Sequence, residues 1–172
     1  MRILGVDPGL GISGYGCVEG PGEQPALIEA GVIRIARTGD LASRLVELDA
    51  DFRDVLERLR PEVVAVESLF AHYKHPSTAI IMGHARGVLL LGARRAGARL
   101  IEYRPNLVKK ALTGHGHAPK DQMQRAIQDV FRLPSLPEPP DLADALAIAL
   151  CASRRIPFED AVATDPKTRG IS

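Results

Sequence analysis

The chain has 172 residues and a formal net charge of +1, with 45% hydrophobic residues, 25% charged residues and no tryptophan. This composition excludes a disordered, fibrous or disulfide-rich protein, and the length suits one domain with a sizeable core. We expect that domain to span residues 1–155 and residues 156–172 to form a flexible tail.

The apolar pattern predicts five strands and five helices. Asp40 suits a helix cap, Pro61 a helix end and Pro76 a first helical turn. Between these signals, β-branched runs and apolar residues at helical spacing alternate. Strands are expected at 3–6, 14–19, 27–36, 62–67 and 99–103, and helices at 41–60, 76–96, 106–112, 120–131 and 141–154.

This order of elements predicts an α/β fold with a five-stranded mixed sheet. The first three strands form an antiparallel series, and the two strands joined through helices run parallel to the first. Sheets of this kind bind ligands at the carboxyl ends of their strands. Asp7 ends the first strand and Glu67 ends the fourth, so their carboxylates meet at one rim if these strands are neighbours.

Two further acids, Asp141 and Asp144, lie three residues apart on one face of the last expected helix. Four carboxylates converging on one rim repel one another, and hard divalent cations relieve that repulsion. An all-oxygen site favours Mg²⁺ or Mn²⁺, and two such ions can drive phosphodiester hydrolysis. The acids therefore predict a metal-dependent nuclease site.

Each acid also has a structural interpretation that the sequence leaves open. Asp141 suits the N-cap of its helix, and Asp144 suits the positive end of the helix dipole. Asp7 suits an Asx turn before the Pro-Gly pair that follows it. Glu67 is harder to explain structurally, because it closes a strongly apolar strand.

The near-neutral total charge conceals a basic segment. Residues 1–70 carry 7 Lys or Arg against 12 Asp or Glu, whereas residues 86–125 carry 9 against 2. Such asymmetry indicates a polyanionic partner such as DNA, although a solvated helical surface gives the same pattern.

No targeting or membrane segment is expected. Asp7 interrupts the apolar start of the chain, and the apolar run 88–93 is far too short to span a bilayer. Cys17 and Cys151 lie in apolar stretches and are expected to be reduced core thiols. We therefore expect a cytoplasmic protein.

Several motifs together resemble the RuvC-type Holliday-junction resolvases of bacteria. They occur in the family's order, from residue 1 to about 155. The motifs are ILGVDPG (3–9), GYG (14–16), VAVESLF (64–70), GHARG (83–87) and DLADALA (141–147). The resemblance implies a ribonuclease-H-like fold, a homodimer, and Mg²⁺ or Mn²⁺, with two ions expected in each active site. It implies four-way junction DNA as substrate and a branch-migration helicase complex as partner.

The same resemblance assigns roles to individual residues. The family's four catalytic acids correspond to Asp7, Glu67, Asp141 and Asp144, and two lysines near the scissile phosphate correspond to Lys109 and Lys120. Lys120 is also expected to assist catalysis. Residues expected to contact DNA are Leu69, Phe70, Tyr73, Lys74, Arg86, Lys109, Lys110, His115, His117 and Lys120.

Some of these DNA contacts have plainer alternatives. Phe70 is the expected base-stacking residue but could instead cover the edge of the core. Lys109 could be an ordinary solvated helix residue, and His115 and His117 are more typical of surface histidines than of metal ligands.

Three other functions fit part of the sequence. Residues 9–14 match the G-x-G-x-x-G pattern of dinucleotide-binding proteins, but that motif opens a helix and this segment is expected to enter a strand. An ATPase half of the actin or sugar-kinase type shares the opening strand and turn, but two such domains are needed to enclose ATP. A junction-binding module without catalysis would use the acids only as caps.

Overall fold

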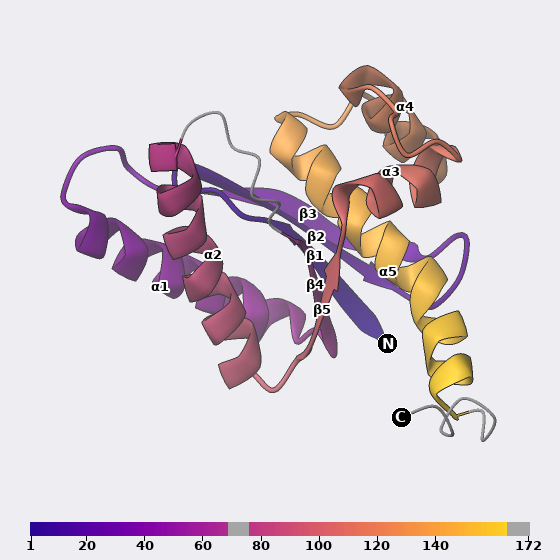
Figure 1. Cartoon of the computed structure of the whole chain (residues 1–172), viewed down its shortest axis with the longest axis horizontal. Helices are drawn as coiled ribbons and strands as arrows, with labels where there is room; N and C mark the ends of the chain where they lie inside the picture. The colour runs from indigo at the N-terminus through magenta and orange to yellow at the C-terminus, as the bar shows by residue number, and fades with distance from the viewer. Residues whose placement is uncertain (69–75, 165–172) are drawn as a thin grey trace.

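The computed structural model describes residues 1–68 and 76–164, and it forms three layers (Figure 1). A five-stranded sheet lies between two helical layers, with α1 and α2 on one face and α3, α4 and α5 on the other. The strands are β1 Arg2–Asp7, β2 Ile12–Glu19, β3 Ala26–Arg34, β4 Val63–Glu67 and β5 Arg99–Tyr103. The helices are α1 Leu41–Leu59, α2 Pro76–Arg95, α3 Pro105–Thr113, α4 Lys120–Phe131 and α5 Pro140–Thr164.

The sheet has the strand order β3-β2-β1-β4-β5 and confirms the expected mixed topology. Strands β1, β2 and β3 pair antiparallel, while β4 runs parallel to β1 and β5 runs parallel to β4. Val6 pairs with Val66 in the register of β1 and β4. The residues that follow this pair, Asp7 and Glu67, therefore lie side by side at the same rim.

A separate hydrophobic core fills each side of the sheet. On the α1 and α2 side, Phe52 and Leu89 are almost fully buried, together with apolar residues of β1 and β4. Asp40 caps α1, as expected, because its carboxylate accepts a hydrogen bond from the Ser43 N–H at 2.8 Å. Both cysteines are buried in these cores with free thiols, as the sequence predicts.

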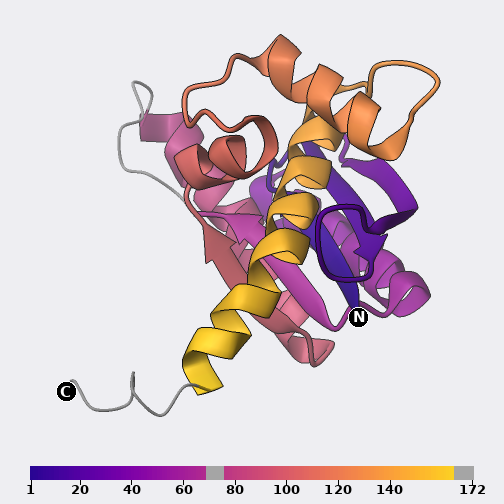
Figure 2. The same ribbon diagram turned by 90° about the vertical axis from the view of Figure 1, so that its right-hand side faces the viewer.

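Glycines in β1 and β2 bring α5 unusually close to the sheet. A Cβ at Gly5 would lie 2.2 Å from the Ala145 carbonyl oxygen, and one at Gly14 would lie 2.0 Å from the Asp141 carbonyl oxygen. Real side chains do not fit at such distances, so the two strands need glycine here for α5 to cross them (Figure 2). This close contact fixes the distance between the first turns of α5 and the sheet, at the end of β1 and the start of β2.

Helix α5 ends ten residues beyond the expected residue 154, so the first part of the predicted tail is helical. Pro157 lies inside the helix and cannot donate to the carbonyl of Ser153. That carbonyl instead accepts a hydrogen bond from the Gly22 N–H at 2.9 Å, so the proline leaves no unmet acceptor there. Residues 156–164 are therefore helical, and residues 165–172 lie outside the described part of the chain.

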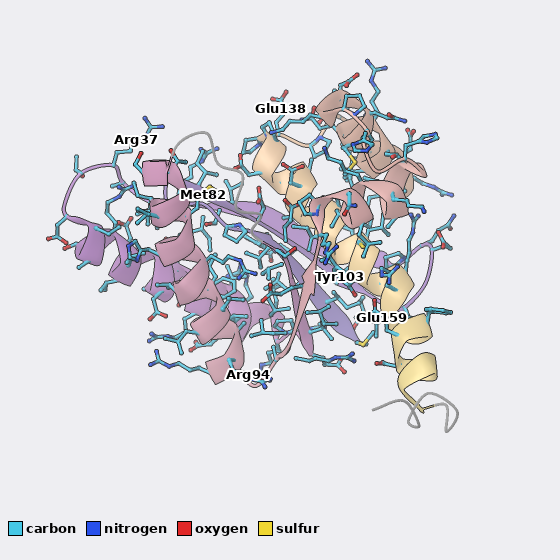
Figure 3. The ribbon with its side chains drawn as sticks, viewed as in Figure 1. Arg37, Met82, Arg94, Tyr103, Glu138 and Glu159 are labelled. Carbon is cyan, nitrogen blue, oxygen red and sulfur yellow. The ribbon has the colours of Figure 1, made fainter. Side chains whose placement is uncertain are left out.

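Contacts with β5 explain why the added turns remain helical. The Tyr103 hydroxyl donates to Glu159 at 3.3 Å, and the two side chains lie close together in Figure 3. Arg99 forms an ion pair with Asp160 at 2.8 Å. The sequence pattern could not reveal these contacts, because they join residues about sixty positions apart.

We predict that Gly14→Ala destabilises the protein by roughly 2–3 kcal/mol, because the added methyl group must displace the backbone of α5. Gly11→Ala is the matched control, since a Cβ at Gly11 meets nothing within 4 Å. Urea denaturation followed by circular dichroism measures both. Equal stability of the two variants would contradict the close contact between β2 and α5.

Candidate active site

The rim where β1 and β4 end carries the first two candidate acids. Asp7 is the last residue of β1 and Glu67 the last of β4, and both are partly buried. The turn after Asp7 is held by Ser13 rather than by the Asp7 carboxylate. The Gly9 N–H donates to Ser13 Oγ at 3.0 Å, and this hydroxyl donates to the Gly9 carbonyl at 2.6 Å.

The Asx-turn interpretation of Asp7 is therefore wrong, and its carboxylate is not used by the turn. Ser13 was not singled out from the sequence, although a serine four residues after a glycine is typical of such side-chain-closed turns.

The other two acids reach this rim from α5. Asp7 pairs with Gly14 across β1 and β2, and Gly14 lies against the backbone of Asp141. Asp144 follows one turn later on the same helix face. Because α5 begins at Pro140, Asp141 is inside the first turn and is not the N-cap, so that structural interpretation is wrong.

The pKa of Asp7 reflects the charges of the other three acids. The pKa of Asp7 is raised from 3.8 to about 7, first by burial and then by the negative charges of Asp144, Asp141 and Glu67. Lys120 opposes this effect and lowers the pKa of Asp7. Each of the other three acids thus acts on Asp7 through space.

Lys109 and Lys120 lie close to these acids. Burial raises the pKa of Glu67 and of Asp144, and in both cases Lys109 and Lys120 lower it. Lys120 is the first residue of α4 and is exposed, whereas Lys109 on α3 is partly buried. The two lysines therefore bring positive charge from the helical layer above the sheet to the acidic rim.

The arrangement of the four acids suits a cation. Within residues 1–68 and 76–160, none of them forms a salt bridge or a hydrogen bond through its carboxylate. Their donors are all carboxylate oxygens, which hard divalent ions prefer. Within the described residues, no three His, Cys, Asp or Glu side chains are already placed to hold a metal ion between them.

The remaining predicted DNA contacts differ in position. Lys110, His115 and His117 are exposed on α3 and on the loop that follows it, on the same side of the sheet as Lys120. Arg86 differs from expectation, because its side chain is only 7% exposed and pairs with Glu102 at 2.7 Å, which leaves little of it for DNA. Four of the predicted contacts lie outside the described residues, namely Leu69, Phe70, Tyr73 and Lys74.

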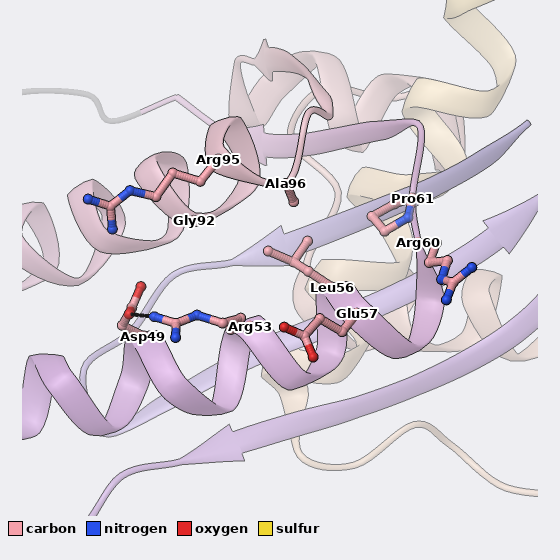
Figure 4. A pocket seen from close by; sticks show the side chains of 9 residues that line it. All are labelled: Asp49, Arg53, Leu56, Glu57, Arg60, Pro61, Gly92, Arg95 and Ala96. Atoms are coloured by element: carbon pink, nitrogen blue, oxygen red, sulfur yellow. Dashed lines mark hydrogen bonds and ion pairs between the residues drawn. The ribbon is translucent and has the colours of Figure 1, made fainter.

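A cavity of the described surface lies elsewhere. It has a volume of about 680 Å³ and separates the C-terminal halves of α1 and α2, where Asp49 pairs with Arg53 (Figure 4). Arg60 and Arg95 also line it. Arg60 precedes the start of β4 and Glu67 ends that strand, so the cavity lies at the other end of the sheet. This cavity does not contain the carboxylates and is not the candidate active site.

The alternatives based on nucleotide binding do not fit this geometry. The G-x-G-x-x-G segment leads into strand β2, whereas a dinucleotide-binding motif must open a helix. The described part of the chain forms one α/β unit, whereas an actin-like ATPase needs two such domains. None of the described helices combines the length and apolar character needed to cross a membrane.

Comparison with known proteins identifies the family. The family model described as crossover junction endodeoxyribonuclease RuvC matches residues 3–152. The chain is 47% identical to the crossover junction endodeoxyribonuclease RuvC of Rhodopirellula baltica, over 87% of this chain and 84% of that protein. It is 44% identical to the same enzyme of Moorella thermoacetica, over 92% and 94% of the two chains.

Solved structures agree with the sequence relatives. Thermus thermophilus RuvC is 36% identical and superposes with a TM-score of 0.82, covering 92% of this chain and 97% of that chain. The same protein in complex with a Holliday junction substrate gives a TM-score of 0.86, covering 92% and 96%. The yeast mitochondrial Holliday junction resolvase Ydc2, at 17% identity and a TM-score of 0.64, shares the fold. The chain therefore belongs to the RuvC family of crossover junction endodeoxyribonucleases.

Proposed function

We propose that this endonuclease resolves four-way DNA junctions by paired, symmetric nicks, with Asp7, Glu67, Asp141 and Asp144 as its catalytic carboxylates. The observation that carries the proposal is the convergence of these acids at one rim with Lys109 and Lys120 beside them. Similarity to a RuvC that was solved with a Holliday junction substrate supports the choice of DNA. This substrate also explains the basic segment of the chain.

The carboxylates would hold two Mg²⁺ or Mn²⁺ ions in each active site. Bound divalent ions supply a water of lowered pKa and neutralise charge on phosphate oxygens. The burial of Asp7 beside three other acids favours cation binding, because a cation relieves both the repulsion and the lost hydration. Glu67 and Asp144, whose pKa values are also raised first by burial, would serve as further ligands.

The lysines act on the DNA side of the site. Lys120 is exposed at the first turn of α4, where the helix dipole also favours a phosphate group. Its ammonium group would donate to a phosphate oxygen as negative charge grows during hydrolysis, leaving a 5′-phosphate on the product. Lys109 contributes positive charge from α3, and Lys110, His115 and His117 would contact the DNA farther from the acids.

A four-way junction requires two nicks, which a two-fold homodimer would supply. The outer face of α2 is our proposed interface, because Ile80 and Leu91 are 62% and 50% exposed there. Gly83 and Gly87 have open space where a Cβ would be, so a second helix can approach closely. Val88, in contrast, packs against the core and is not available for this contact.

We place the protein in the cytoplasm with the chromosome, where a branch-migration helicase complex would deliver the junction. Both inferences rest on the family. A module that binds junctions without cutting them is the main alternative, and it would leave the buried repulsion of the four acids without a purpose.

Asp7→Asn is expected to reduce nicking of a synthetic four-way junction to background in Mg²⁺, while binding of the junction in Ca²⁺ survives. The substitution removes one of the four negatively charged metal ligands but leaves the basic surface that binds the DNA unchanged. Asp54→Asn, an exposed acid on α1, is the control and should cut normally. If the Asp7 variant cut at the wild-type rate, the proposal that Asp7 is a catalytic carboxylate would be wrong.

The same Asp7→Asn change should stabilise the protein when EDTA has removed metal ions. The folded state raises the pKa of Asp7 to about 7, so it holds that proton more tightly than the unfolded chain does. Its contribution to stability is therefore present in acid and is lost as the pH rises through about 7. At about pH 8 the variant should gain roughly 2–4 kcal/mol, at about 1.4 kcal/mol per pKa unit.

Urea unfolding at a series of pH values measures this effect. The gap between variant and wild type should widen from about pH 4 to about pH 7 and narrow when Mg²⁺ is added. A gap that does not change with pH would show that Asp7 is not destabilised by its neighbours.

Lys109→Ala and Lys120→Ala should each lower the single-turnover cleavage rate by about 10–100-fold, because both lysines act on the acidic rim. Lys110→Ala provides the comparison, since Lys110 is exposed and is not among the charges that shift the pKa of Asp7, Glu67 or Asp144. This variant should bind the junction more weakly, and the slope of log binding constant against log salt concentration should fall by about one. The cleavage rate of the bound complex should change little. Equal rate losses in all three variants would contradict separate roles.

Ile80→Glu and Leu91→Glu should convert the protein to monomers, as measured by sedimentation velocity, and should uncouple the paired nicks. Val46→Glu on α1 is the matched control, because Val46 is 69% exposed but lies outside the proposed interface. If the α2 variants remained dimeric, the interface would lie elsewhere.

A further inference from the structure

Arg86 occupies an unusual position for a charged residue. It lies on α2 with 7% of its side chain exposed, and its Nη2 atom is 2.7 Å from Glu102 Oε2. Its Nε atom is buried and has no hydrogen-bond partner in the described part of the chain. A buried guanidinium with an unmet donor destabilises a fold, and an apolar residue of similar size would often serve stability better. Stability alone therefore does not explain Arg86.

The surroundings of Arg86 join three elements of the protein. A shallow cavity of about 390 Å³ opens beside it, between the end of β4, the middle of α2 and strand β5. Glu102 is half-exposed in this cavity, so water weakens its ion pair with Arg86. The residues that line the cavity are Ser68, Gly83, Arg86, Gly87, Leu90 and Glu102.

One wall of the cavity leads directly to the active site. Ser68 follows Glu67, and its N–H donates to the Tyr103 carbonyl at 2.8 Å. Its hydroxyl donates to the same carbonyl at 3.2 Å. Glu102 precedes Tyr103 in β5, so the ion pair adjoins the hydrogen bonds that hold the end of β4.

The opposite wall belongs to the outer face of α2. Gly83 and Gly87 lie on this wall with open space beside them, and the exposed Ile80 and Leu91 flank them along the helix. A second copy of the chain seated on this face would cover the cavity. Covering it would exclude water from the Arg86–Glu102 pair and strengthen the attraction between the two charges.

We propose that Arg86 is a positioning residue that couples dimer formation to the catalytic carboxylate Glu67. The second copy closes the cavity, the strengthened Arg86–Glu102 pair fixes β5 against α2, and the Ser68–Tyr103 hydrogen bonds then hold Glu67 at the rim. The inference rests on the proposed function, because it requires the α2 dimer and cation binding by Glu67. Coupling of this kind is reciprocal, so an ion bound at the rim must also tighten the dimer.

Sedimentation equilibrium of the full chain, with and without Mn²⁺ and in the absence of DNA, tests the coupling. For the wild type we expect Mn²⁺ to lower the dimer dissociation constant by about tenfold, within the usual range of such coupling. Arg86→Met keeps the length of the side chain and removes its charge, and it should abolish the effect of Mn²⁺. Glu102→Gln, at a half-exposed position that tolerates substitution, should do the same.

Arg94→Met is the matched control, because Arg94 is exposed at the far end of α2 (Figure 3). It should retain the full effect of Mn²⁺. The wild type could dimerise and cut junctions while its dimer dissociation constant is the same with and without Mn²⁺. That result would overturn the coupling and leave the proposed function intact. Retention of the Mn²⁺ effect in folded Arg86→Met and Glu102→Gln would also overturn it. A wild type that never dimerises would overturn both.

Discussion

The close approach of α5 to the glycines of β1 and β2 is the constraint on which the rest of this protein depends. Side chains at Gly5 and Gly14 would collide with the helix backbone, so these strands carry none where α5 crosses. The helix can then lower Asp141 and Asp144 to the rim where Asp7 and Glu67 end their strands. Without this contact the carboxylates would belong to two separate surfaces.

That contact has an electrostatic cost, which explains much of the site. Burial, and then the repulsion of the neighbouring carboxylates, raises the pKa of Asp7 to about 7, and the ordered fold must hold the acids together against this effect. Hydrophobic burial on both faces of the sheet provides the necessary rigidity. A bound cation would offset the free energy that is lost when these charges are buried. A metal-dependent nuclease is expected to show this pattern, in which the active site destabilises the metal-free protein.

Much of this arrangement could be predicted from the sequence. The order of elements determined the mixed sheet, and the acids at the ends of two parallel strands indicated the site, because neighbouring parallel strands end at one rim. Asp144 was also predicted, from its spacing of one turn after Asp141 on the last helix. The sheet order is confirmed because it depends on local spacing and on general rules of strand connection, whereas the catalytic roles of these acids stay a prediction.

The errors came from contacts between distant residues. The last helix is expected to end at residue 154, but the Gly22 N–H satisfies the carbonyl that Pro157 leaves free, and α5 continues. The sequence predicts that Arg86 contacts DNA, but its side chain is buried and pairs with Glu102 on β5. The collision at Gly14 carries no strong sequence signal, since it involves packing against a segment that is remote in the chain.

The most direct test of the central claim is anomalous diffraction from crystals of the protein soaked in Mn²⁺. The account predicts manganese peaks between the carboxylates of Asp7, Glu67, Asp141 and Asp144, with the ions bound by their oxygen atoms. Manganese bound only at other acids, with these four carboxylates turned away from one another, would contradict it.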